Sequence, residues 1–307
     1  MVDRPATAAR AARLVCCGLT TLDVVQVVDA VPGPDEKVVA RSLEVAFGGP
    51  AANAAATAVA LGVRAVLVTA LGEGRVGELV RAGLRDAGVD VVDLLAGCPG
   101  DPPVSTVLVT ASTGQRAVVS TNATGRPDDL GPAAEGVLAV LDGATAVLVD
   151  GHHLAAAEVL AAQARSRDVP VLLDGGSWKR GLDRLLAHVD VAVLSGDFRL
   201  PDEPALTPDE LLDAVAGLGP TVVARSAGAG PVRVRLAAGH DEVLPPVLGP
   251  DELVDTLGAG DVLHGAVGAG LARGLDPVAA LRAAVPVATE SCRYGGALGW
   301  AAVRGRG

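Results

Sequence analysis

A short glycine-rich segment, residues 254–266 (VDTLGAGDVLHGA), places carboxylates beside residues with almost no side chains. Gly258, Ala259 and Gly260 directly precede Asp261. If a helix begins at Gly258, its first backbone N–H groups are free to bind an anion, and the small residues let a phosphate approach the backbone. A carboxylate in that first turn can accept a proton from a hydroxyl group that attacks phosphorus. The spacing therefore predicts a phosphoryl-transfer site.

The same residues also fit an ordinary helix N-terminus. In that interpretation Asp255 or Thr256 caps the helix, and Asp261 only interacts with the helix dipole. For a bare Gly-Ala-Gly-Asp this would be the simpler explanation. The full D-T-x-G-A-G-D pattern, followed by His264, is much more specific and favours the anion site.

A second pair of glycines lies early in the chain, in GGPAANAA (48–55). Paired glycines after a strand permit positive φ and a hinge, although a tight turn has the same composition. Asn53 opens an Ala-rich segment, 53–62, that is typical of a helix ending at Gly62. Taken alone, Asn53 is best interpreted as the cap of that helix, and Asp23 as a loop acid.

Together the two motifs resemble the signatures of the PfkB family of carbohydrate kinases, which share the ribokinase-like fold. The C-terminal signature, D-T-x-G-A-G-D, is matched by residues 255–261, and the N-terminal one, G-G-x-x-x-N-x-A, by residues 48–55. The resemblance covers nearly the whole chain, from Gly18 to about Gly299. It implies an ATP-dependent kinase with Asp261 as catalytic base and an anion hole formed by Gly258, Ala259 and Gly260.

The resemblance also implies the other site residues. Four would line the sugar site or act as its hinge: Asp23, Gly48, Gly49 and Asn53. Two lie where many members bind a monovalent cation such as K⁺: Asp255 and Thr256. One resembles an acid near the phosphates or metal-bound waters, which implies Mg²⁺ with the nucleotide: Asp174. Four lie in the segments that take the place of the family's nucleotide-binding motifs, and are expected to contact the nucleotide: Ser195, Arg225, Gly228 and Gly230.

Three departures from the family pattern bear on the function. The usual N-x-x-E is absent, and LSGDFRL (194–200) stands in its region. RSAGAG (225–230) replaces T-x-G-x-x-G, and Leu263 and His264 replace a common aromatic residue and a common Asn. These departures keep two alternatives open, a nucleoside kinase of the same fold and a catalytically impaired regulator that binds sugar or nucleotide. Asp261 is intact, which argues against loss of catalysis.

A third glycine motif suggests a different class of enzyme. LGEGRVG (71–77) contains a literal G-x-G-x-x-G, at Gly72, Gly74 and Gly77, between a strand-like and a helix-like segment. Such a loop can bind a dinucleotide, which would make the chain an NAD-dependent oxidoreductase. PfkB kinases, however, carry a similar G-x-D-x-x-G loop at this point. We therefore interpret it as a strand–helix turn near the substrate site.

Composition limits the remaining possibilities. The 307 residues are 50% hydrophobic but only 2% aromatic, so Ala, Val and Leu must build the core. A net charge of −11 disfavours nucleic acid as a partner. The four cysteines show no C-x-x-C spacing, which is typical of reduced thiols in a cytoplasmic protein. We predict no signal peptide, no membrane span and a disordered tail over residues 1–11.

The order of elements predicts how these residues meet. Apolar strands at 145–150, 169–174, 189–195 and 220–226 alternate with helices, and two further helices cover 258–273 and 276–294. This predicts a doubly wound, mostly parallel α/β sheet with helices on both faces, and ligands at the carboxyl ends of its strands. Extra β segments at about 24–47 and 100–122 do not fit the alternation and would form a small β lid. Charged residues in these segments, such as Arg116, are expected to be solvated.

The sequence thus predicts a single ribokinase-like domain over 12–300 that phosphorylates a hydroxyl group of a small carbohydrate, a ketose or related sugar. Sugar and ATP are the expected partners, with Mg²⁺ and K⁺ as metals. A homodimer would form through the exposed face of the lid sheet, because such a face needs cover.

Overall fold

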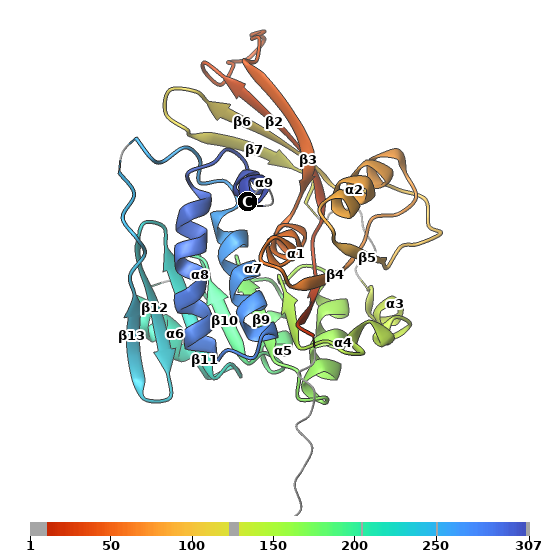
Figure 1. The fold of residues 1–307 in the computed structure, drawn as a ribbon, viewed down its shortest axis with the longest axis vertical. Coiled ribbons are helices and arrows are strands. Elements are labelled where there is room, and N and C mark those ends of the chain that lie inside the picture. Colours follow the sequence, from red (N-terminus) through yellow and green to blue (C-terminus); the bar gives the residue numbers. More distant parts are fainter. Residues whose placement is uncertain (1–10, 123–128, 204, 250, 305–307) are drawn as a thin grey trace, which may run out of the picture.

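The computed structural model describes residues 11–122, 129–203, 205–249 and 251–304. Most of its strands belong to one large sheet (Figure 1). These strands are β1 (Arg13–Cys17), β4 (Arg64–Thr69), β5 (Asp90–Asp93), β8 (Ala146–Val149), β9 (Val171–Gly175), β10 (Val191–Leu194), β11 (Val222–Ala227), β12 (Gly230–Leu236) and β13 (Gly239–Val243). Their order is β13-β12-β11-β10-β9-β8-β1-β4-β5. All neighbours from β11 to β5 pair in parallel, and β12 and β13 add an antiparallel edge.

Helices cover both faces of this sheet. They are α1 (Pro50–Ala60), α2 (Arg75–Asp86), α3 (Gly131–Glu135), the short 3₁₀ helix η1 (Leu138–Leu141), α4 (Leu154–Arg165), α5 (Leu182–Leu186), α6 (Pro208–Ala216), α7 (Ala259–Ala272), α8 (Pro277–Ser291) and α9 (Gly299–Arg304). Helices α1, α2, α7 and α8 bury side chains in one core, and α3 to α6 in a second core on the opposite face. The predicted mostly parallel α/β sheet with helices on both faces is confirmed.

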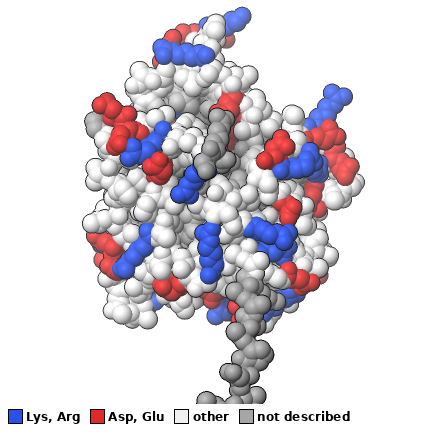
Figure 2. All heavy atoms as spheres, in the orientation of Figure 1, with Lys and Arg blue, Asp and Glu red and all other residues white. Residues whose placement is uncertain are grey.

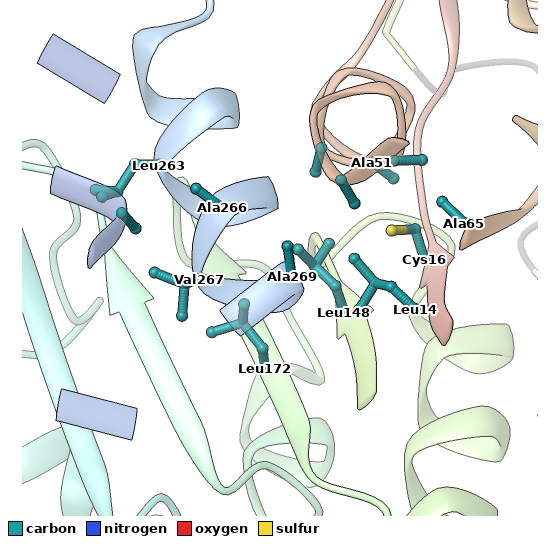
Figure 3. Packing of buried hydrophobic residues seen from close by; sticks show 14 of the residues in the cluster. Leu14, Cys16, Ala51, Ala65, Leu148, Leu172, Leu263, Ala266, Val267 and Ala269 are labelled. Carbon is teal, nitrogen blue, oxygen red and sulfur yellow. The ribbon is translucent and has the colours of Figure 1, made fainter. Parts of the chain in front are cut away.

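The first strand shows how one segment serves both cores. In β1, Leu14 and Cys16 point to the core under α1 and α7, whereas Val15 and Cys17 point to the other. Both cysteines are free and fully buried, and burial raises the pKa of their thiols. Figure 3 shows Leu14 with Leu148 beside it, and Cys16 close to Ala65.

The small sheet consists of β2 (Thr21–Val28), β3 (Ser42–Gly48), β6 (Val104–Thr110) and β7 (Arg116–Ser120), in the order β3-β2-β6-β7. It projects from the top of the body in Figure 1. Asp23 pairs with Ala46 and Ser105, so these three share one face. Val45 and Val119 are aligned through Val24 and Thr106, each one residue away from the Asp23 row, so their side chains belong to the other face. The predicted lid segments thus form one sheet, although β2 begins at Thr21, before the expected boundary.

Helices α1 and α7, which carry the two sequence motifs, are in backbone contact. A Cβ atom on Gly265 would lie only 2.5 Å from the carbonyl oxygen of Ala54, so no larger residue fits at this crossing. The close approach of two small-residue helices sets the distance between the side chains at their N-terminal ends.

Some expected boundaries were wrong. Helix α1 begins at Pro50, three residues before the predicted start, because Gly49 turns the chain with φ 96° and Pro50 supplies a favourable first helical residue. Helix α8 ends at Ser291, three residues before the predicted end at 294, and β5, α3 and α9 were not predicted. Of the predicted tail, residues 1–10 lie outside the described residues. Within the described ranges, no helix has the length and apolar character needed to cross a membrane.

Candidate active site

The first turn of α7 has the geometry that an anion site requires. Gly258 is the N-cap, with φ 73°, and a Cβ atom there would lie 2.4 Å from Cβ of Ala297. Gly260 faces open space, because nothing lies within 4 Å of where its Cβ would be. The Ala259 N–H donates to Thr256 O over 3.3 Å, whereas the N–H of Gly260 has no carbonyl partner among the described residues, as is usual at a helix N-terminus. Neither Asp255 nor Thr256 caps α7, so the alternative of a side-chain cap was wrong.

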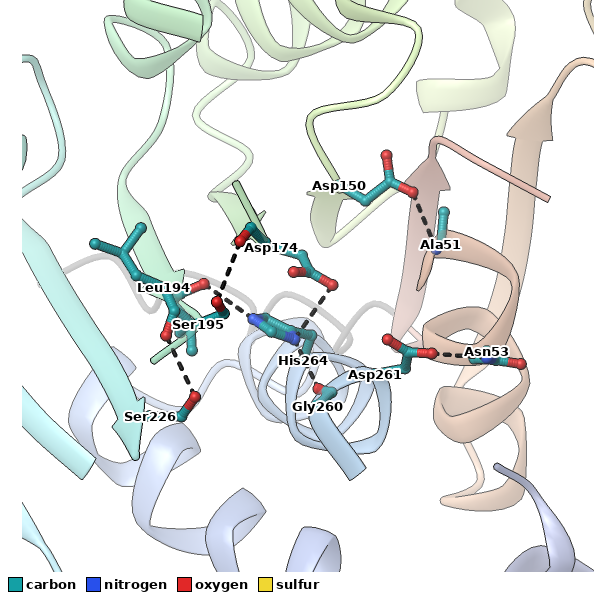
Figure 4. Close-up of polar contacts among 12 residues, drawn as sticks. Ala51, Asn53, Asp150, Asp174, Leu194, Ser195, Ser226, Gly260, Asp261 and His264 are labelled. Carbon is teal, nitrogen blue, oxygen red and sulfur yellow. Dashed lines mark hydrogen bonds and ion pairs between the residues drawn. The ribbon is translucent and has the colours of Figure 1, made fainter. Parts of the chain in front are cut away.

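Asp261 in that turn is joined to the N-terminal motif. The amide Nδ2 of Asn53 donates to Oδ2 of Asp261 over 2.7 Å (Figure 4). Asn53 is not the cap of its helix, as its type suggested, because α1 begins earlier and the Asn53 N–H already donates to Gly49 O within the first turn. Its Oδ1 atom is buried and has no hydrogen-bond partner among the described residues. This unpaired acceptor therefore lies on the same side chain that holds Asp261.

The surroundings of Asp261 make its carboxylate a better base than an ordinary aspartate. Burial raises its pKa to about 7, and the nearby Asp174 carboxyl adds to this rise. The hydrogen bond from Asn53 acts in the opposite direction, since it stabilises the ionised form. A pKa close to neutral is suited to accepting a proton during catalysis.

Asp174 and His264 form a buried pair next to Asp261. Asp174 ends β9, and its Oδ2 lies 3.2 Å from Nδ1 of His264, one turn along α7 from Asp261. Burial, with the Asp150 carboxylate, raises the pKa of Asp174 to about 8. The sequence identified Asp174 as a site residue, whereas His264 was noted only as a departure from the family pattern.

Asp150 is a site residue that sequence reasoning missed. It ends β8, and its Oδ2 accepts hydrogen bonds from the N–H groups of Leu19, at 2.8 Å, and Ala51, at 3.2 Å. Burial alone would raise its pKa, but His152 and the backbone donors lower it to about 2. The carboxylate thus supplies the N-terminus of α1 with the acceptor that Gly49 lacks. The available signal was the repeated strand ending, VLVD beside VLLD.

The other proposed sugar-site residues lie together at the base of the small sheet. Asp23 is partly buried, which raises its pKa, and its Oδ1 accepts a hydrogen bond from Thr21 over 2.6 Å. A Cβ atom on Gly48 would lie 2.0 Å from the Asp23 carboxyl, and one on Gly49 would lie 2.5 Å from Leu19 O. No larger residue fits at either position, so these close contacts explain both glycines whether or not they also act as a hinge.

The proposed nucleotide residues are not all brought to this site. Ser195 lies at the end of β10, and its hydroxyl donates to Gly176 O over 3.1 Å, close to the end of β9. Arg225 instead points to the α6 face of the sheet, where it binds the carbonyl oxygen of Gly196 and lines a cavity of about 260 Å³ with Leu211. The other two lie at the turn between β11 and β12: Gly228 and Gly230.

The two residues proposed for a monovalent cation are engaged by the protein itself. The carboxylate of Asp255 accepts hydrogen bonds from the N–H groups of Leu257, at 2.9 Å, and Gly296, at 2.9 Å. The hydroxyl of Thr256 accepts one from Arg116 over 2.6 Å, which links β7 of the small sheet to the loop before α7. Arg116 is therefore partnered, and not simply solvated as expected.

The G-x-G-x-x-G loop is closed by a carboxylate of the chain itself. Oδ1 of Asp101 accepts from the N–H groups of Val76, at 2.7 Å, and Gly77, at 3.1 Å, at the start of α2. A Cβ atom on Gly74 would lie 2.0 Å from that carboxyl. Asp101 thus occupies the position that a dinucleotide phosphate would need. The geometry disfavours the oxidoreductase alternative.

A comparison with known families decides how this site is classified. The family model described as pfkB family carbohydrate kinase matches residues 11–300. The chain belongs to this family. The resemblance on which the sequence interpretation rested is thereby confirmed.

Similar proteins cover nearly the full length of this pfkB chain. It is 28% identical to ketohexokinase of Mus musculus over 292 residues, which are 91% of this chain and 96% of the relative. It is 27% identical to ribokinase of Bacillus subtilis (strain 168) over 297 residues, 92% and 94% of the two chains. The structure of Arabidopsis thaliana ribokinase complexed with ribose and ATP matches with a TM-score of 0.72 at 22% identity, covering 94% and 95%. The predicted ribokinase-like fold is confirmed.

Proposed function

We propose that the protein transfers the terminal phosphoryl group of ATP to a hydroxyl group of a small carbohydrate, a ketose or a related sugar. The observation that carries the proposal is the position of Asp261. It lies in the first turn of α7, beside the open backbone of Gly260 and 2.7 Å from Asn53. A base, an anion site and a free acceptor for a sugar hydroxyl thus share one place in a pfkB family chain.

Asp261 acts as the general base in this proposal. Its carboxylate accepts the proton of the sugar hydroxyl as that oxygen attacks the terminal phosphorus and the bond to the nucleotide's bridging oxygen breaks. The first-turn N–H groups at residues 258–260 stabilise the negative charge on the transferred group, chiefly that of Gly260, because the Ala259 N–H already donates to Thr256 O. Asn53 and Asp23 orient the sugar through its hydroxyl groups. The lid role of the small sheet, with a hinge at Gly48 and Gly49, is part of the proposal and would exclude water.

The residues of the site fit ATP and Mg²⁺ better than they fit a monovalent cation. ATP phosphates fit the open first turn of α7, where Gly260 leaves space. Mg²⁺ would enter on those phosphates and neutralise their charge. Within the described ranges no three His, Cys, Asp or Glu side chains form a metal site of their own. The Thr256 hydroxyl already accepts a hydrogen bond from the Arg116 guanidinium, which disfavours a monovalent cation at this position.

A screen of ADP release tests the proposal. Ketoses, aldoses, sugar acids, sugar phosphates and nucleosides are offered with ATP and Mg²⁺ to the wild type and to Asp261→Asn. Asp241→Asn, at a surface ion pair with Arg282, is the control. We expect acceptor-dependent ADP release that falls by about 10²–10⁴-fold in Asp261→Asn and persists in the control. Turnover unaffected by Asp261→Asn would contradict the assignment of the base.

The screen also separates the two remaining alternatives. Release with nucleosides alone would indicate the nucleoside kinase, and ligand binding without any turnover would indicate the regulator. The altered segments at 195–198 and 225–230, which replace the family's usual nucleotide motifs, motivate that second alternative. The cytoplasmic location expected from the free cysteines stays a prediction.

A further inference from the structure

The imidazole of His264 is surrounded by oxygen atoms at both of its nitrogens. Nε2 lies 2.9 Å from the carbonyl oxygen of Val193 in β10. Nδ1 lies 2.6 Å from the carbonyl oxygen of Gly260 and 3.2 Å from Oδ2 of Asp174. The ring is only 5% exposed and the Asp174 residue 6%, so water cannot replace these contacts freely.

Counting protons restricts the charge of this cluster. Carbonyl oxygens only accept hydrogen bonds, so the contact with Val193 requires a proton on Nε2. A neutral imidazole then has no proton left for Nδ1, which would face two oxygens with its lone pair. That arrangement is unfavourable in a buried site. The cluster therefore needs a second proton, which lies either on Nδ1, facing Gly260 O at 2.6 Å and the Asp174 carboxylate, or on Oδ2 of Asp174, from which it is donated to Nδ1.

We propose that His264 and Asp174 share this proton as a net-neutral pair, and that the pair is a positioning device for Asp261. The proton compensates the Asp174 carboxyl, so that Asp261 does not face an uncompensated negative charge from β9. The contact of Nδ1 with the Gly260 carbonyl also fixes the plane of the peptide between Gly260 and Asp261. The N–H of that peptide belongs to the first turn of α7, where the anion would bind.

The other ionisable groups that act on this cluster come from neighbouring elements. Asp150, at the end of β8, acts on both Asp174 and His264, and it is itself paired with His152. Lys179, after β9, favours the ionised form of Asp174. Asp261 on α7 favours the protonated ring, whereas burial lowers the pKa of His264. These effects oppose one another, and they act on which of the two groups holds the second proton while the pair stays net neutral.

Nuclear magnetic resonance of the intact protein tests the pair without any assay of activity. The chain has five histidines, so ¹⁵N-labelled His264 can be assigned from the signals missing in His264→Gln. We expect an Nδ1 shift typical of a hydrogen-bonded, protonated or proton-sharing nitrogen, unchanged between pH 6 and 8. In Asp174→Asn the ring should become an ordinary Nε2–H tautomer. A wild-type ring that titrates near its ordinary value, or that keeps its shifts in Asp174→Asn, would overturn the proposal.

A kinetic experiment tests the link to Asp261, which rests on the proposed function. We expect His264→Gln to move the acidic limb of the kcat profile to higher pH by about one unit, whereas His240→Gln, an exposed histidine of β13, leaves it in place. An unmoved limb in His264→Gln would overturn the positioning role. If no acceptor supports turnover, the proposed function fails, but the resonance experiment still decides whether the neutral pair exists.

Discussion

Asn53 and Asp261 are joined side chain to side chain over 2.7 Å although 208 positions separate them in the chain. Each belongs to one of the two motifs that stand out in the sequence. The backbone contact between α1 and α7 at Gly265 brings their helices together. The hydrogen bond therefore turns two distant sequence patterns into one site, and its strength adjusts the basicity of Asp261.

Activity should depend on pH through the ionisation of Asp261. Because burial and Asp174 raise the pKa of this carboxyl to about 7, we expect kcat to increase from pH 5.5 and to level off above about pH 8. Steady-state ADP release across this range measures the profile. An activity that stays constant between pH 5 and 8 would show that a different group accepts the proton.

Removing the Asn53 amide should shift the pH profile of kcat toward higher pH. The amide stabilises ionised Asp261, so Asn53→Ala should raise the pKa of Asp261 and move the acidic limb to higher pH. We also expect a higher KM for the sugar, since Oδ1 is lost. Thr57→Val is the matched control, because Thr57 lies one turn further along α1 and its buried hydroxyl has no partner among the described residues. A shift in both variants would point to a general effect of α1.

Asp261 should reduce stability at alkaline pH. Its carboxyl has a pKa of about 7 in the folded protein, against 3.8 for an ordinary aspartate, so the folded state binds the proton more tightly than the unfolded state does. The resulting stabilisation is complete below about pH 4 and is lost as pH rises through 7. We expect Asp261→Asn to be more stable than the wild type at pH 8 by roughly 1–3 kcal/mol, and by much less at pH 5. Urea unfolding measures the free energy of unfolding of both proteins at both pH values. The same difference between Asp261→Asn and wild type at pH 5 and pH 8 would contradict this account.

Gly48 should be important for sugar affinity. An added methyl group at this position would overlap the Asp23 carboxyl, at 2.0 Å, and displace it. We expect Gly48→Ala to raise the KM for the sugar at least about 10-fold, on the order of a lost charged hydrogen bond, with little change in the KM for ATP. Gly33→Ala is the control, since its nearest contact would be 3.6 Å away. An equal KM for the sugar in both variants would contradict the assignment of Asp23 to the sugar site.

The outer face of the small sheet should hold a second copy of the chain. Leu43, Val45 and Val119 are exposed by 63%, 52% and 74%, and the strand register puts them on the face opposite Asp23. We propose that this apolar face forms a homodimer. Val119→Glu should give a monomer in light scattering, whereas Val118→Glu, on the Asp23 face, should not. A monomeric wild type would contradict the proposal.

Predictions from the sequence were most accurate for elements that a local pattern of residues determines. Runs of buried apolar residues and glycine stops located most strands and helices of the large sheet, whereas β5 was missed because its four residues, DVVD, place acids at both ends. The role of Asp261 could be expected from one motif. The contacts of Asp150 with Leu19, and of His264 with Val193, join residues 131 and 71 positions apart, which no local pattern encodes. The contact of Arg225 with Gly196 O likewise depends on how the strands are aligned, and its role toward a nucleotide stays a prediction.

On the face of the molecule in Figure 2, acidic and basic side chains are interspersed, so the net charge of −11 does not gather in one patch there. The sites proposed here depend on buried contacts at the carboxyl ends of the strands, and surface charge plays little part in them.

The position of α7 has a consequence for biosynthesis. This helix packs Val267 and Ala269 into the core with Leu14 and Leu148, which belong to strands made much earlier (Figure 3). While the ribosome extends the chain, α1 and α2 can already cover part of this face of the sheet, but the part under α7 and α8 stays uncovered until the last fifth of the protein has emerged. We expect the nascent chain to need a chaperone during that interval, and a premature stop before Gly258 to yield an aggregating product.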